Sequence, residues 1–240
     1  MKAAQSTTAV LVNAGPARAL AYFGLAISPA TLFAAWMIAP SGVYLTAIVL
    51  AVGFALAVRS MAARYPHDRL GACNVVTATR LALASILVAT LSGDTLGAPD
   101  WIVFGIAVAT LSLDGVDGWL ARKQDLCSEF GARFDMEVDS ALAAILALYA
   151  AAAGYGGLEL IVLGASRYLF IVATALWPAL AAPLPHSLAR KAVCALQITT
   201  LALLSLGFLP DGIMRTLSIG VALLVAWSFA RDVRWLTSTS

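Results

Sequence analysis

The chain has 240 residues, of which 61% are hydrophobic and only 12% are charged. About 25% of the residues of an ordinary soluble domain are charged, so the composition excludes that class and predicts an integral membrane protein. The formal net charge of +2 gives no indication of a nucleic-acid partner.

Apolar runs long enough to cross about 30 Å of hydrocarbon recur along the whole chain. In chain order they lie at residues 19–39, 43–58, 75–91, 101–120, 134–153, 158–180, 192–209 and 213–229. Each run is predicted to be a helix, because open sheet edges cannot be satisfied in lipid and the runs lack the alternation of a barrel strand. We therefore expect an all-α, polytopic membrane bundle of about eight transmembrane helices.

The longest polar interruption in the first half of the chain runs from Arg59 to Asn74 and contains Pro66. Its composition is typical of a linker. It predicts a division into a two-helix N-terminal transmembrane appendage with its cytoplasmic linker, residues 1–70, and a six-helix core, residues 71–240.

Lysine and arginine are distributed unevenly between alternate loops. The predicted loops on one side hold Lys2, Arg18, Arg59, Arg64, Arg69, Arg122, Lys123, Arg133, Arg190, Lys191, Arg231 and Arg234. The other side holds Arg215 alone. By the positive-inside rule the first side faces the cytoplasm. We expect the chain in the bacterial inner membrane, with its active site facing the cytoplasm.

Carboxylates gather in one segment, LDGVDGWLARKQDLCSEFGARFDMEVDS, which runs from Leu113 to Ser140. Asp114 and Asp117 are three residues apart on the fourth predicted helix, and Asp135 and Asp139 are four apart on the fifth, so each pair shares a helix face. The short connection lets the two pairs converge near the cytoplasmic boundary. Converging carboxylates repel one another unless cations neutralise them. Hard oxygen ligands suit Mg²⁺ or Mn²⁺, and two ions would balance the charge.

Small and cationic residues surround these acids. Gly118 and Ala121 would let a flat base or a phosphate approach the helix backbone closely, and Gly131 would give the same clearance on the next helix. Arg122 supplies a planar cation suited to a phosphate or a pyrimidine carbonyl.

The four aspartates fit the signature D-x-x-D-G-x-x-A-R-x8-G-x-x-x-D-x-x-x-D together with Gly118, Ala121, Arg122 and Gly131, and these eight residues occupy every fixed position. The chain therefore resembles the CDP-alcohol phosphotransferase (CDP-alcohol phosphatidyltransferase) family. The resemblance implies that a CDP-linked donor, commonly CDP-diacylglycerol, reacts with an alcohol to give a phosphodiester and CMP. It also implies a homodimer, since family members are often dimeric.

The resemblance also assigns roles to the residues of the signature. It implies a two-metal centre held by Asp114, Asp117, Asp135 and Asp139, in which Asp139 is also the base for the acceptor hydroxyl. The residues expected to bind the CDP donor are Asp114, Gly118, Ala121, Arg122 and Gly131.

Two weaker patterns bear on the acceptor, and both resemble phosphatidylglycerophosphate synthases. Asn74, Thr77 and Arg80 form N-x-x-T-x-x-R at the start of the third predicted helix. Lys191 and Gln197 fit a degraded G-K-x-x-T-x-x-Q.

The second pattern departs from the signature where Arg190 replaces its glycine and Cys194 its threonine, which leaves glycerol 3-phosphate open as the acceptor. Arg167, Arg190 and Lys191 would instead form an anion pocket, as in relatives that use inositol phosphate. A phosphorylated polyol is favoured, and an unphosphorylated alcohol is the alternative.

Two further questions stay open at the level of sequence. Arg80 and Arg167 either extend to the membrane interface, pair with an acid, or serve the site. A cation transporter with a carboxylate site at its cytoplasmic edge would explain the acids. It would not explain Gly118, Arg122 and Gly131 at their spacings.

Overall fold

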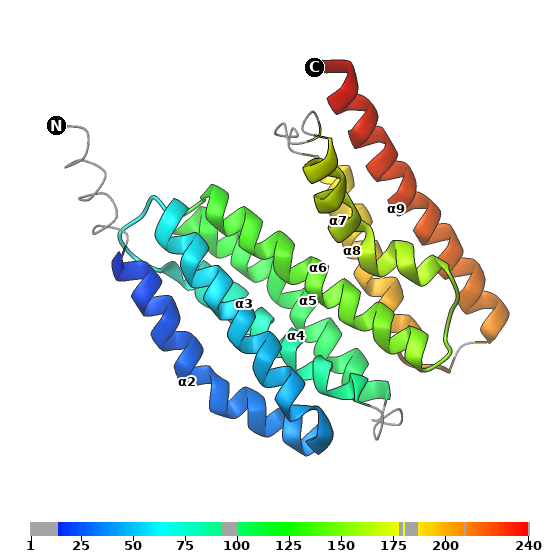
Figure 1. Cartoon of the computed structure of the whole chain (residues 1–240), viewed down its shortest axis with the longest axis horizontal. Helices are drawn as coiled ribbons and strands as arrows, with labels where there is room; N and C mark the ends of the chain where they lie inside the picture. Colours follow the sequence, from blue (N-terminus) through cyan, green and yellow to red (C-terminus); the bar gives the residue numbers. More distant parts are fainter. Residues whose placement is uncertain (1–13, 93–99, 178–179, 181–186, 209, 240) are drawn as a thin grey trace. The chain divides into compact units, whose positions relative to one another are not determined.

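The computed structural model describes residues 14–92, 100–177, 180, 187–208 and 210–239. Eight α-helices and no strand occur in these ranges (Figure 1). The helices are α2 (Ala14–Ile38), α3 (Val43–Arg64), α4 (Gly71–Val88), α5 (Asp100–Lys123), α6 (Glu129–Ala152), α7 (Glu159–Leu176), α8 (Leu188–Leu204) and α9 (Asp211–Thr239). Two short 3-10 turns, η1 (Pro40–Gly42) and η2 (Ala89–Leu91), follow α2 and α4. The all-α prediction is confirmed.

Six of the described helices are long and apolar enough to cross a membrane, namely α2, α3, α4, α5, α7 and α9. Helix α6 carries Asp135, Glu137 and Asp139 in its first half, and α8 has only 17 residues. The prediction of a polytopic helical membrane protein is confirmed.

Several helix ends differ from the apolar runs that predicted them. Helix α4 begins at Gly71 rather than at residue 75, and α6 begins at Glu129 rather than at residue 134. Hydropathy marks only the part of a helix that lies in hydrocarbon, so polar first turns are missed. Helix α8 ends at Leu204, and Gly207 follows in the left-handed region with φ of +61°, a conformation that ends helices and favours glycine.

The chain forms two compact units. The first unit comprises Met1–Ala98 and Ala109–Val138, and the second comprises Pro99–Val108 and Asp139–Ser240. The divisions therefore fall inside α5 and α6, each of which continues from one unit into the other.

In the first unit, α2 packs on α3 and α4, and α3 packs on α4 (Figure 1). Their apolar side chains share one buried core with the start of α6. This core contains Ala17, Leu20, Leu50, Phe54, Ala57, Met61, Tyr65, Ala78, Leu81, Ala82, Phe130, Phe134 and Val138. The two N-terminal helices thus share a buried core with α4 and with the start of α6, which carries Gly131 and Asp135.

A close backbone approach joins the α2–α3 turn to the end of α4. A Cβ atom added at Gly42 would lie 2.3 Å from the carbonyl oxygen of Ala89. Ala35, Ala39 and Ala89 form a small buried cluster at the same place. Only glycine fits position 42, because any larger residue would displace the backbone of η2.

In the second unit, α9 packs against both α7 and α8. Polar groups link these helices: the buried Gln197 amide of α8 donates to the Leu163 carbonyl of α7. Arg190 Nη1 lies 3.1 Å from Asp232 Oδ2 of α9. Such bonds satisfy polar groups that would otherwise be costly to bury.

Candidate metal centre

A tight turn between α5 and α6 brings the two signature helices together. Asp125 adopts a left-handed conformation with φ of +53°, and the Leu126 N–H donates to the Ala121 carbonyl at 3.0 Å. Ser128 Oγ then accepts from the Gly131 N–H at 3.0 Å. A serine that accepts from the third residue after it is a typical N-cap, so Ser128 accounts for the start of α6 at Glu129.

Three of the four predicted aspartates converge. Asp114, Asp135 and Asp139 each offer a carboxylate oxygen, and these oxygens lie within 4.8 Å of one another. Asp139 lies one helical turn beyond Asp135 on the continuous helix α6, so the helix itself holds the two on one face. All three residues are partly buried.

Asp117 is held differently, because it is buried against α4. Its side chain is only 6% exposed. Thr77 Oγ1 donates to Asp117 Oδ2 at 2.9 Å, and Arg80 Nη1 donates to the same oxygen at 2.7 Å. A carboxylate at this depth needs such donors, since an unpaired buried charge is strongly unfavourable.

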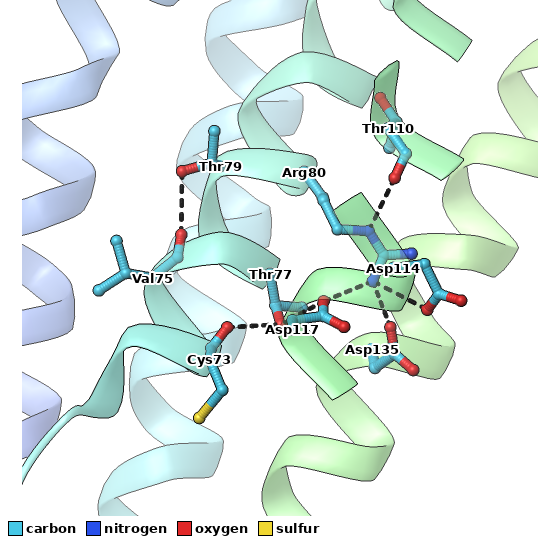
Figure 2. Close-up of polar contacts among 9 residues, drawn as sticks. All are labelled: Cys73, Val75, Thr77, Thr79, Arg80, Thr110, Asp114, Asp117 and Asp135. Atoms are coloured by element: carbon cyan, nitrogen blue, oxygen red, sulfur yellow. Dashed lines mark hydrogen bonds and ion pairs between the residues drawn. The ribbon is translucent and has the colours of Figure 1, made fainter. Parts of the chain in front are cut away.

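Arg80 lies at the centre of the arrangement with a fully buried side chain (Figure 2). Its Nη1 contacts Asp117 Oδ2, Asp114 Oδ1 at 3.2 Å and Asp135 Oδ1. Its Nε donates to the Thr110 carbonyl oxygen at 3.1 Å. Of the alternatives open for Arg80, the structure shows the pairing with acids.

The charge balance of the centre is unequal. One guanidinium faces Asp114, Asp117 and Asp135, and Asp139 adds a fourth carboxylate within 4.8 Å of those of Asp114 and Asp135. Full ionisation would gather four negative charges here, and Arg80 brings one positive charge to them. Clustered carboxylates with excess negative charge suit hard divalent cations, so the donor set fits Mg²⁺ or Mn²⁺.

The small residues of the signature leave space beside these acids. A Cβ atom at Gly118 would have Arg122 Nη1 as its nearest neighbour, at 3.7 Å. Ala121 is partly buried, and Arg122 is exposed. Gly131 lies closer to its surroundings, since its Cβ would be 3.3 Å from Ser128 Oγ and 3.8 Å from Asn74 Oδ1.

The linker before α4 contacts the α5–α6 turn. Asn74 Nδ2 donates to Tyr65 Oη at 3.0 Å, and the Tyr65 ring meets the Phe130 ring edge-on, with centroids 5.6 Å apart. The Ala72 N–H donates to Gln124 Oε1 at 3.0 Å. Burial raises the pKa of the Tyr65 phenol above its ordinary value, so the hydroxyl keeps its proton.

Only some of these supporting residues belong to a recognisable sequence pattern. Asn74, Thr77 and Arg80 recur every third residue, which places them along one face of α4. Tyr65 and Gln124 belong to no motif, and only tertiary packing brings them to this end of the centre.

The residues predicted for the acceptor belong to the second unit. Arg190 pairs with Asp232, and Lys191 is exposed. Arg167 is partly buried on α7. Asp232, the partner of Arg190, was not predicted from sequence, because it lies 42 residues away outside any motif.

A model of the CDP-alcohol phosphatidyltransferase family matches residues 70–230, about two thirds of the chain. The chain belongs to this family of membrane transferases, which move a substituted phosphate group from a CDP-alcohol to an acceptor and use divalent metals. Neither a curated protein nor a solved structure matches the chain.

Proposed function

We propose that the protein transfers a phosphatidyl group from CDP-diacylglycerol to an alcohol, with release of CMP. The favoured acceptor is a phosphorylated polyol such as glycerol 3-phosphate or inositol phosphate. The observation that carries the proposal is the convergence of Asp114, Asp135 and Asp139 beside the buried Arg80, within the matched family segment.

The proposed reaction is a single displacement. The acceptor hydroxyl oxygen attacks the phosphorus that bears diacylglycerol, the bond from that phosphorus to the CMP oxygen breaks, and CMP leaves with the bonding electrons. The hydroxyl proton passes to the Asp139 carboxylate. A carboxylate in hydrogen-bond reach of the acceptor hydroxyl can act as its general base. No covalent enzyme intermediate is required.

Asp114, Asp117, Asp135 and Asp139 are the proposed metal ligands. Divalent cations bound there would offset the charge of the pyrophosphate and of the departing CMP. Thr77 and Arg80 hold Asp117, and α6 holds Asp135 and Asp139 in register. The protein thereby orients the ligands before substrate binds.

The proposed donor site extends along α5 from Asp114 to Arg122. The open space at Gly118 lets a base or phosphate approach the backbone, and exposed Arg122 can pair with phosphate. For the acceptor phosphate we propose Arg167, Arg190 and Lys191. Arg167 is partly buried on α7, and it is the residue to test first.

CMP release by purified protein, supplied with CDP-diacylglycerol and Mg²⁺ or Mn²⁺, tests the proposal. The acceptors are glycerol 3-phosphate, inositol phosphate and their dephosphorylated forms. We expect acceptor-dependent CMP release that EDTA abolishes. Asp125→Asn is the matched control for the aspartates, because Asp125 is exposed and asparagine tolerates its left-handed conformation.

Equal CMP release with EDTA and with Mg²⁺ would exclude the metal-dependent mechanism. Equal use of phosphorylated and dephosphorylated acceptors would reassign the enzyme to an unphosphorylated alcohol. Absence of CMP release, together with cation uptake into proteoliposomes, would favour a transporter.

We also propose a homodimer in the bacterial inner membrane, with the α5–α6 turn in the cytoplasm and residues 1–70 as an appendage to the family core. The family match starting at residue 70 supports that division.

Cysteine labelling at positions 125 and 156, in a cysteine-free background, should occur from opposite sides of the membrane. Light scattering of the detergent complex measures the oligomeric state.

A further inference from the structure

Arg80 connects three helices through one buried guanidinium. The side chain starts on α4, bonds the Thr110 carbonyl, Asp114 and Asp117 on α5, and reaches Asp135 on α6 (Figure 2). These partners lie 30 to 55 residues away in sequence. A buried arginine of this kind is stable only when such acceptors surround it.

The three carboxylates differ in their access to solvent. The Asp117 side chain is 6% exposed, whereas those of Asp114 and Asp135 are 38% and 28% exposed. Thr77 binds Asp117 as well. Asp117 is therefore the anchored member, and Asp114 and Asp135 keep surface through which a cation can approach.

Arg80 cannot serve as a substrate contact in this arrangement. Its side chain has no exposed surface, and its guanidinium is engaged with α5 and α6. To meet a phosphate it would have to leave the carboxylates, and their charge would then be unbalanced.

We propose that Arg80 is a positioning residue, an internal counter-cation that assembles Asp114, Asp117 and Asp135 in the metal-free protein. Divalent ions take over part of this charge balance when they bind. The inference rests on the proposed metal-dependent function and explains why the N-x-x-T-x-x-R residues Thr77 and Arg80 face the aspartates.

Thermal unfolding of the purified protein in detergent tests this role, followed by the fluorescence of the six tryptophans. Each variant is measured in EDTA and with saturating Mn²⁺. Arg80→Met keeps an unbranched side chain but removes the charge. We expect its Tm in EDTA to fall by about 10 °C. The rise in Tm on adding Mn²⁺ should be at least about twofold larger than in wild type, since metal replaces the lost cation.

A double variant separates charge balance from packing without using metal. In EDTA, Arg80→Met with Asp117→Asn should recover at least about half of the Tm lost in Arg80→Met, because it removes the unpaired charge as well. Arg80→Lys should lie between wild type and Arg80→Met. The control is Arg133→Met, whose ion pair with Glu129 lies on an exposed face and should change neither Tm nor the Mn²⁺ effect.

The outcomes distinguish the two proposals. If wild type shows no rise in Tm with Mn²⁺, the proposed metal centre is wrong. If wild type responds but Arg80→Met shows the same Mn²⁺ effect and no rescue by Asp117→Asn, only the role of Arg80 is wrong. If Arg80→Met cannot be purified, a folded double variant supports the proposal, and an equally unstable one overturns it.

Discussion

The two units bury arginine in different ways. In the first unit, Arg80 is fully buried and contacts Asp114, Asp117 and Asp135 from two other helices. In the second unit, Arg190 has a side chain that is 28% exposed and pairs with Asp232. Arg80 thus faces three carboxylates, whereas Asp232 faces two guanidinium groups, because Arg231 Nη2 also lies 3.5 Å from Asp232 Oδ1.

This difference separates the proposed cation site on α4, α5 and α6 from the contact between α8 and α9. The contact of Arg190 on α8 with Asp232 on α9 can stabilise helix packing without a ligand. Several carboxylates around one guanidinium favour the binding of a further cation.

Neutralising an acid in each unit tests the contrast directly. Asp135→Asn, like Asp114→Asn or Asp117→Asn, should reduce CMP release to background, because it unbalances the ion cluster. Asp232→Asn should change the rate by less than about threefold, since it weakens contacts with Arg190 and Arg231 and removes no proposed metal ligand. The same assay with EDTA gives the fully inactive reference. A comparable loss in Asp232→Asn would show that the second unit's pair also serves the chemistry.

Asp139 tests whether one carboxylate of the centre acts as a base. Asp139→Asn keeps the size of the side chain but cannot accept the hydroxyl proton, so kcat should fall by about 10²–10⁴-fold. Affinity for the CDP donor, measured by equilibrium binding of CDP, should change far less. A parallel loss of CDP affinity and rate would assign Asp139 to metal binding alone.

Arg167 tests whether the second unit contributes an anion site. Arg167→Ala should raise the KM for a phosphorylated acceptor by about 10–100-fold, because a charge-assisted hydrogen bond is lost. KM for the CDP donor should stay nearly constant. The comparison with the dephosphorylated acceptor decides the matter, since an equal penalty on both acceptors would mean that Arg167 binds no phosphate.

Two glycines test how tightly the helices pack inside each unit. Gly42→Ala should lower Tm by about 3–8 °C, because the new Cβ would meet the Ala89 carbonyl oxygen at 2.3 Å. Gly220→Ala on α9 should leave Tm unchanged or slightly raised, since no described atom lies within 4 Å of its Cβ position. Equal Tm values for both variants would contradict the close approach of η2 to the α2–α3 turn.

Local sequence determined much of this protein. Apolar runs predicted all eight described helices, because the bilayer fixes the length of a spanning segment. The spacings of three and four residues placed each aspartate pair on one helix face, since a helix repeats every 3.6 residues. Gly118 and Arg122, at fixed distances from these acids, made the family recognisable.

Tertiary structure alone decided which charges meet. Arg80 is 37 residues from Asp117 and 55 from Asp135. The local sequence around Arg80 is the same whether its side chain extends to the membrane interface, pairs with an acid or serves the site. The pairing of Arg190 with Asp232 likewise spans 42 residues. The sequence also does not predict that Tyr65, Phe54 and Phe134 are buried in one core. Apolar residues that face lipid and those that face another helix cannot be distinguished by residue type.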